Sequence, residues 1–164
     1  MTALFIGRFQ PLHIGHITII QNLLKRYDEV VVMIGSANKS RTEKNPWTLT
    51  ERIEILNIVF GDEENISLMS QVDYPEDDAW WNDVIDKVGH IDQVYSGNPW
   101  VLSICEKHSM PSTSIEILYQ LSATKIRRLL SQKKPIVDLV HRATHDLVVT
   151  SYELIKHALK SSPL

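Results

Sequence analysis

The sequence has a single cysteine and no long apolar run, and each absence excludes a class of protein. With Cys105 alone, the 164-residue chain can form neither an internal disulfide nor a zinc site of several cysteines, which is typical of a reducing compartment. No apolar stretch approaches the roughly 20 residues that span a bilayer. Arg8 and Gln10 interrupt the apolar N-terminus too early for a secretion signal. We therefore expect a cytoplasmic protein that does not bind membranes.

The sequence also lacks an excess of positive charge. Lysine and arginine total 17 against 20 aspartates and glutamates, which gives a net charge of −3. Such a chain has no global positive field to attract a polyanion, so nucleic acid is not expected as a partner. Any phosphate site has to be built locally.

Short β-prone segments alternate with helical patterns along the chain. Residues 3–7 (ALFIG) and 29–36 (EVVVMIGS) predict strands, and the second is apolar on both faces, as a central parallel strand is. Thr50 is expected to cap a helix that follows it, and residues 137–159 predict a long final helix. The sequence shows neither a repeat nor a linker. We expect one domain over residues 1–164, with an α/β fold in which helices cover both faces of an open parallel sheet.

The loop after the first strand, GRFQPLHIGH, concentrates candidate anion-binding groups. Gly7 ends the strand, and Gly15 removes a side chain where the next helix begins. His13 and His16 lie three residues apart at that helix N-terminus, where they can share an anion with the free N–H groups, and Arg8 adds a guanidinium. Neither GxGxxG nor GxxxxGK[ST] occurs. The structural alternative is that one histidine caps the turn and the other lies on the surface.

A second candidate segment is LSATKIRRLLSQKK, residues 121–134. Ser122 suits the N-cap of a helix, Thr124 offers a hydroxyl in the first turn, and Lys125, Arg127 and Arg128 add positive charge. A solvated basic helix is the alternative. Because cations beside a helix N-terminus are unfavourable unless an anion is bound there, we favour phosphate binding.

Four motifs together resemble the archaeal-type nicotinamide-nucleotide adenylyltransferases of the His-x-Gly-His nucleotidyltransferase superfamily. They are GRFQPLHIGH, GSANKSRTEKNPWTLTERI, VYSGNP and LSATKIRRLL, in the family's order over nearly the whole chain. The resemblance implies a Rossmann-like fold that transfers AMP from ATP to nicotinamide mononucleotide (NMN), giving NAD and pyrophosphate, with Mg²⁺ on the ATP phosphates. Class I aminoacyl-tRNA synthetases share the HIGH string, but their Lys-Met-Ser-Lys-Ser loop is absent here.

The resemblance also implies which residues act on ATP. Arg8, His13, His16 and Arg127 would be the catalytic groups, and the histidines would hold the α- and β-phosphates. Further ATP contacts would come from residues in loops and at helix starts: Gly7, Phe9, Gly15, Gly97, Asn98, Ser122 and Thr124. Because the phosphate nucleophile is already anionic at neutral pH, no general base is needed, and catalysis reduces to positioning and charge neutralisation. No protein ligand for a metal is implied.

Two other segments would bind NMN by the same resemblance. Asn38, Lys44 and Asn45 lie in NKSRTEKNPWT, and Trp80 lies in DYPEDDAWWNDV, where its ring would stack on the cationic pyridinium. The alternative is that one or both adjacent tryptophans belong to the core. Arg41 stands where a histidine is common in the family, and together with Lys44 it makes this segment more basic, which would suit a differently charged acceptor.

Two other functions are weighed against this one. The first is another His-x-Gly-His nucleotidyltransferase with a phosphopantetheine, flavin mononucleotide (FMN) or cytidylyl acceptor, and the second is a nucleotide-sensing regulator without turnover. The apolar positions of the final helix and the family's habit favour a homo-oligomer. His141 and His145 have the i, i+4 spacing of metal ligands, but HExxH is absent and a surface pair is favoured.

Overall fold

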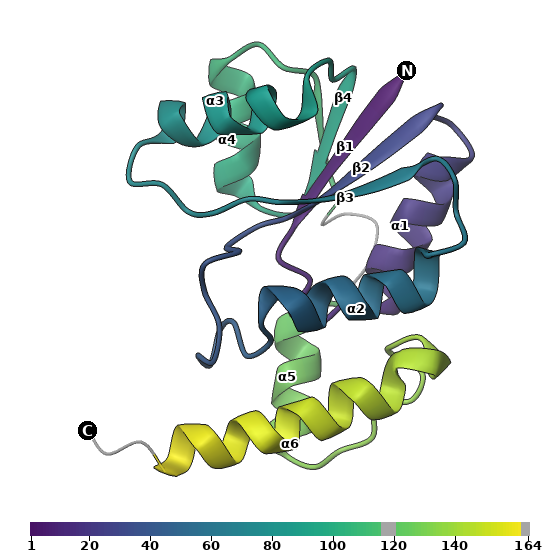
Figure 1. The fold of residues 1–164 in the computed structure, drawn as a ribbon, viewed down its shortest axis with the longest axis vertical. Coiled ribbons are helices and arrows are strands. Elements are labelled where there is room, and N and C mark those ends of the chain that lie inside the picture. Colours follow the sequence, from purple (N-terminus) through teal and green to yellow (C-terminus); the bar gives the residue numbers. More distant parts are fainter. Residues whose placement is uncertain (116–120, 162–164) are drawn as a thin grey trace. The chain divides into compact units, whose positions relative to one another are not determined.

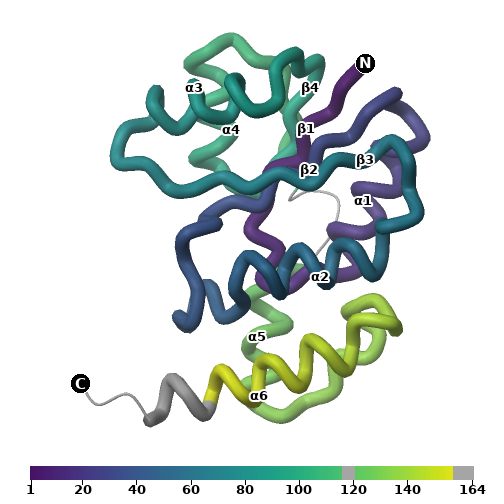
Figure 2. The backbone as a smooth tube through the Cα atoms, in the orientation of Figure 1, coloured from purple at the N-terminus to yellow at the C-terminus, as the bar shows by residue number. Residues whose placement is uncertain are grey.

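The computed structural model describes residues 1–115 and 121–161, which form two compact units. The first unit contains residues 1–8, 18–38 and the described residues from 63 to 115; the second contains residues 9–17, 39–62 and 121–161. The chain therefore passes between the units several times; Figure 2 traces its backbone from the N-terminus to the C-terminus. Helix α1 (Ile14–Leu24) contributes to both.

The first unit contains a parallel sheet of five strands in the order β3-β2-β1-β4-β5 (Figure 1). The strands are β1 (Thr2–Gly7), β2 (Glu29–Ile34), β3 (Ile66–Ser70), β4 (Gln93–Ser96) and β5 (Ser112–Ser114). From β1 the order runs to β2 and β3 on one side and to β4 and β5 on the other. In such sheets the carboxyl ends of the strands where the order reverses are the usual place for a ligand. The predicted open parallel sheet is confirmed.

Apolar side chains fill both faces of the sheet. On one face, strand residues pack with α3 (Asp77–Val88) and α4 (Pro99–Lys107) in a core of buried residues that includes Leu4, Ile6, Val31, Met33, Trp80, Trp81, Val84 and Ile104. The alternate strand residues of the other face, such as Phe5 and Val32, are fully buried as well. Because both faces are covered, β2 has no polar alternation, which explains the continuous apolar run EVVVMI.

The second unit is helical, and it corrects two predictions. Its elements are α2 (Leu49–Phe60), α5 (Ala123–Ser131), the 3-10 turn η1 (Arg142–Thr144) and α6 (His145–Ser161). Thr50 lies inside α2; the N-cap is Thr48, whose hydroxyl accepts the Glu51 N–H at 3.2 Å while the Glu51 carboxylate accepts the Thr48 N–H at 2.7 Å. This reciprocal capping box satisfies two N–H groups at once, which Thr50 could not do.

The predicted final helix begins eight residues later than expected, at His145. The preceding residues turn instead, because His141 Nδ1 accepts the Ala143 N–H at 3.3 Å and the Thr144 hydroxyl donates to the His141 carbonyl at 2.9 Å. These side-chain bonds compete with the helical pattern.

Among the described helices none is long and apolar enough to cross a membrane.

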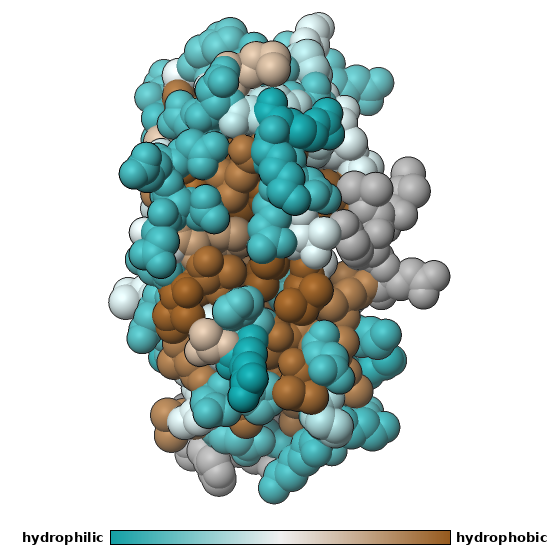
Figure 3. All heavy atoms as spheres, turned by 90° about the vertical axis from the view of Figure 1, so that its right-hand side faces the viewer, coloured by the Kyte–Doolittle hydropathy of each residue, from teal (hydrophilic) through white to brown (hydrophobic). Residues whose placement is uncertain are grey.

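Some apolar side chains of the second unit face solvent. The most exposed of them are Ile58 in α2, Val137 in the segment before η1, and Leu154 in α6. Figure 3 shows apolar surface on one face of the molecule. Isolated exposed apolar residues are common in monomers, so the expected homo-oligomer stays a prediction.

Candidate functional site

The loop between β1 and α1 stacks the two predicted histidines on each other. Their ring centroids are 3.6 Å apart and their planes are inclined by 19°. His13 caps α1, since its Nδ1 accepts the His16 N–H at 3.3 Å. His16 is half-buried and meets the Phe9 ring edge-on at 5.0 Å, so it is not the surface residue of the structural alternative. The loop therefore presents two adjacent imidazoles, as the motif predicted.

Burial keeps both imidazoles neutral. His13 is 4% exposed, and burial lowers its pKa to about 4. Burial also lowers the pKa of His16 well below the ordinary value, and repulsion from His13 lowers it further. Two imidazolium rings this close would repel each other, whereas two neutral rings can each donate one N–H. An arriving phosphate would raise both pKa values, because an opposite charge favours the protonated form.

The backbone of this loop has an unusual shape at Phe9. Its φ is 49°, in the left-handed region that aromatic residues rarely adopt. The residue is 1% exposed, so packing of its ring opposes relaxation of the backbone. Such a conformation costs on the order of 1 to 3 kcal/mol and tends to occur at functional sites. The sequence carried no signal for it.

Helix α5 directs one of its three cations toward the histidine loop. Ser122 caps the helix as predicted, accepting the Lys125 N–H at 3.2 Å. Arg127 Nη1 donates to the carbonyl of Gln10 at 2.7 Å, and its Nη2 donates to the Thr124 hydroxyl at 3.0 Å. Lys125 and Arg128 are exposed. The structure thus brings Arg127 and Thr124 to the histidine loop, while the solvated alternative holds for the two other cations of the helix.

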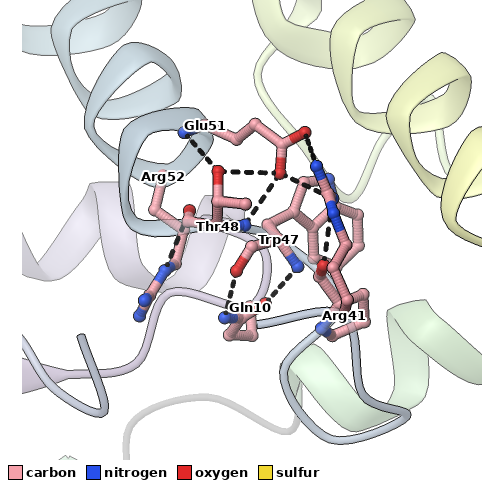
Figure 4. Close-up of polar contacts among 7 residues, drawn as sticks. Gln10, Arg41, Trp47, Thr48, Glu51 and Arg52 are labelled. Carbon is pink, nitrogen blue, oxygen red and sulfur yellow. Dashed lines mark hydrogen bonds and ion pairs between the residues drawn. The ribbon is translucent and has the colours of Figure 1, made fainter. Parts of the chain in front are cut away.

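Arg41 of the 39–47 loop forms an ion pair with Glu51 in the first turn of α2. Its guanidinium donates to both carboxylate oxygens of Glu51, at 2.9 and 2.8 Å, and to the Pro46 carbonyl at 3.2 Å (Figure 4). Burial raises the pKa of Glu51, but its bonds to Arg41 and Thr48 outweigh this and hold the pKa below its usual value. The pair offsets the charge of Arg41, so the added basicity predicted for this segment depends on Lys44, and its effect on the acceptor stays a prediction.

A buried residue that the sequence did not single out connects this loop to the histidines. Gln10 is 1% exposed, its Nε2 donates to the Trp47 carbonyl at 2.9 Å, and its Oε1 accepts the Trp47 N–H at 2.9 Å (Figure 4). In the same loop Asn45 is 6% exposed and Lys44 is exposed. The partner of Gln10 is 37 residues away, so no local pattern reveals the contact.

In the first unit, two further predicted residues hold loops at the ends of strands. The Asn38 side-chain oxygen accepts the Asp73 N–H at 3.2 Å, while the Ser36 hydroxyl donates to the Asp73 carboxylate at 3.0 Å. Asn98 follows Gly97 after β4 and caps α4, accepting the Trp100 N–H at 3.1 Å. The strand-to-helix turn with Pro99 in the first helical position is confirmed, and an adenosine contact by Asn98 stays a prediction.

Both tryptophans of α3 belong to the core. Trp80 is 2% exposed, and its ring lies 4.9 Å from that of Trp100 in an edge-to-face arrangement. The Trp100 indole donates to Asp77 at 3.1 Å. Trp81 is also buried and stacks against His108 at 5.6 Å. Stacking of a substrate ring on Trp80 thus requires a neighbour such as Trp100 to move aside.

Among the residues that the structure describes, no group of three side chains could hold a metal ion. His141 caps η1, and His145 pairs with Asp146 at 2.8 Å. These local contacts agree with the surface interpretation of the two histidines.

The chain is similar to known proteins over most of its length. Residues 4–129 match the family model described as cytidylyltransferase-like. The nicotinamide-nucleotide adenylyltransferase of Thermococcus kodakarensis is 33% identical over 153 residues, which cover 89% of this chain and 81% of the relative. The enzyme of the same name from Sulfurisphaera tokodaii is 34% identical over 159 residues, 90% of each chain.

Solved structures share the fold at lower identity. A bifunctional NMN adenylyltransferase/ADP ribose pyrophosphatase from Francisella tularensis, complexed with AMP and a manganese ion, matches with a TM-score of 0.76 at 16% identity. That match covers 99% of this chain and 56% of the bifunctional protein. A NadR protein in complex with NAD and AMP-PNP matches with a TM-score of 0.69 at 23% identity, over 87% of this chain and 43% of that one.

Proposed function

Because the chain belongs to the cytidylyltransferase-like family, and within it to the nicotinamide-nucleotide adenylyltransferases, we propose that it transfers AMP from ATP to NMN. The products are NAD and pyrophosphate. The observation that carries the proposal at the site is the stacked pair of neutral imidazoles, with Arg127 bonded to the same loop. These groups are hydrogen-bond donors for phosphate oxygens, and they lie in two of the segments that carry the resemblance to the family, GRFQPLHIGH and LSATKIRRLL.

The reaction requires stabilisation of negative charge on the phosphates rather than proton transfer. A phosphate oxygen of NMN attacks the α-phosphorus of ATP, the bond from that phosphorus to the bridging oxygen breaks, and pyrophosphate leaves with the electron pair. The attacking oxygen is anionic at neutral pH, so no side chain has to remove a proton. His13 and His16 would donate N–H groups to the α- and β-phosphates as negative charge accumulates.

Other residues would hold the remaining parts of ATP. Arg127 and Thr124 already bond to each other, and a phosphate would replace one of their mutual or main-chain contacts. Ser122, the N-cap of α5, lies in the same motif. Residues assigned to the rest of ATP by their motifs are Gly7, Arg8, Phe9, Gly15, Gly97 and Asn98.

A divalent cation would accompany ATP, and we propose Mg²⁺. Mg²⁺ commonly binds through substrate phosphates and water with few protein ligands. This mode of binding is compatible with the residues that the structure describes, among which no three His, Cys, Asp or Glu side chains are grouped as metal ligands. When bound, the ion neutralises phosphate charge. The protein's own contribution is then the orientation of the phosphates by His13, His16 and Arg127.

The acceptor would contact residues of two loops. Lys44, which is exposed, would pair with the NMN phosphate, and Asn45 and Asn38 would bond to its polar groups. Trp80 would stack on the pyridinium after its neighbour moves aside.

The experiment that tests the function is pyrophosphate release from ATP and Mg²⁺ with NMN, nicotinic acid mononucleotide or FMN as acceptor. We expect release with NMN and, for His16→Ala, a rate lower by about a hundredfold or more, the usual cost of one lost transition-state donor. His141→Ala is the matched control, because it removes a histidine that caps a turn outside the motif. Release only with FMN would overturn the acceptor, and ATP binding without release would indicate a nucleotide sensor.

A further inference from the structure

The side chain of Gln10 links the histidine loop to the main chain of the 39–47 loop. Its carboxamide bonds to both the N–H and the carbonyl of Trp47, each at 2.9 Å, as the backbone of a neighbouring strand would. Its own carbonyl accepts Arg127 Nη1 at 2.7 Å. At 1% exposure these bonds are shielded from water. One residue therefore joins three segments: the loop of the histidines, helix α5 through Arg127, and the end of the 39–47 loop.

The rest of the 39–47 loop is closed upon itself. The Arg41 N–H donates to the Pro46 carbonyl and the Thr42 N–H to the Asn45 carbonyl, both at 3.2 Å. The Asn45 N–H donates to the Thr42 hydroxyl at 3.0 Å. Lys44 sits at the turn of this closed loop and is exposed. Because the loop is internally bonded, we expect it to keep its shape, and its position then depends on its two attachments: the Gln10 bonds to Trp47 and the Arg41 ion pair with Glu51 of α2.

We propose that Gln10 is a positioning residue for the acceptor. By holding Trp47, it places Lys44 and Asn45 at a defined distance from the histidines that hold ATP. The inference rests on the proposed function, since these two residues are its proposed NMN contacts. Gln10 itself touches no reacting atom, and its effect on the reaction passes through the loop.

Gln10→Met tests this directly, because methionine keeps the length and volume of the side chain but forms neither bond to Trp47. Gln10→Glu keeps the acceptor for the Trp47 N–H and loses the donor for the Trp47 carbonyl, so it serves as a second variant of equal size. The matched control is Thr144→Val. It removes a different hydrogen bond of a buried side chain to a main-chain carbonyl in the same unit, the one that the Thr144 hydroxyl donates to the His141 carbonyl at 2.9 Å, and it leaves the 39–47 loop unchanged.

The expected result is a split between the kinetic constants. Gln10→Met should raise the KM for NMN by about tenfold or more, since it loses a pair of buried hydrogen bonds, and Gln10→Glu should raise the same KM through the buried Trp47 carbonyl that it leaves without a donor; in both variants the KM for ATP should change much less. Thr144→Val should lower the melting temperature and leave both KM values unchanged. If the Gln10 variants behave like Thr144→Val, Gln10 is a purely structural residue and the proposal is wrong.

Trypsin provides a readout that does not depend on activity. Lys39, Arg41 and Lys44 are cleavage sites in the exposed part of the loop, and Gln10→Met should be cut there faster than the wild type. Equal cleavage rates would overturn the proposal whatever the reaction is. If the wild type shows no turnover with NMN, the proposed function fails by itself; faster cleavage of the variant would then show a loop held by Gln10 for a different purpose, which overturns the acceptor role.

Discussion

Acidification should destabilise the folded protein through His13. An imidazole in the unfolded chain takes up a proton near its ordinary pKa of 6.5, whereas the folded protein delays protonation until about pH 4. Between these values the unfolded state binds more protons, so the free energy of unfolding falls as the pH falls. Above the ordinary pKa both states are neutral at His13, and this contribution vanishes.

The size of the effect follows from the separation of the two pKa values. Each unit corresponds to about 1.4 kcal/mol, so His13 alone should lower the stability by about 2 kcal/mol at pH 5 and by about 3 kcal/mol below pH 4. The lowered pKa of His16 acts in the same direction. For a chain of this length, 2 kcal/mol shifts the melting temperature by roughly 4 to 8 °C.

Thermal unfolding followed by circular dichroism at pH 8 and pH 5 measures this difference. His13→Asn is the informative variant, because asparagine can still cap α1 with its side-chain oxygen but does not titrate. The drop in melting temperature between the two pH values should be roughly 4 to 8 °C smaller in His13→Asn than in the wild type. Equal drops in both proteins, or a His13 titration near its ordinary pKa by NMR, would refute the reasoning.

Three further outcomes are expected. Cys105 is fully buried and burial raises its pKa to about 11, so a thiol-reactive disulfide reagent should modify the native protein slowly and the urea-unfolded protein at once. Arg127→Lys should raise the KM for ATP in pyrophosphate release, because an ammonium cannot bond to Gln10 and Thr124 in the same fork geometry; an unchanged KM would exclude Arg127 from ATP binding. Arg41→Ala should change the melting temperature little, since exposed ion pairs contribute about 0.2 to 1 kcal/mol, yet it should speed tryptic cleavage after Lys39 and Lys44, the sites that this variant keeps in the loop.

Local patterns in the sequence predicted the framework of the fold. The apolar run of β2, the N-cap at Ser122 and the position of Pro99 each depend on a few neighbouring residues, and all agree with the structure. The misplaced cap of α2 was also readable, because Thr48 and Glu51 form the T-x-x-E pattern of a capping box. Thr50 lies closer to the apolar positions of the helix, but the reciprocal hydrogen bonds between Thr48 and Glu51 determine where the helix begins.

The contacts that shape the site could not be predicted from local sequence patterns. Gln10 and Trp47 are 37 residues apart, and Arg41, which pairs with Glu51, has a left-handed backbone with φ 57° that the residue type at this position does not predict. The proximity of His13 and His16 followed from helical spacing, but their stacking and neutrality depend on burial by residues elsewhere in the chain. Spacing therefore indicated which residues matter, and packing determined their state.

The neutrality of the histidine pair bears on which anions the loop will retain. At pH 7 the His13 ring must gain about 4 kcal/mol of favourable interaction before it becomes an imidazolium, because its pKa is about 4. A chloride ion supplies little of that and meets two uncharged rings, whereas a polyphosphate brings several charges at once and can drive the protonation itself. From the lowered pKa values of the two histidines we therefore expect the loop to be uncharged in dilute salt at neutral pH and to become cationic when a ligand of high charge density binds.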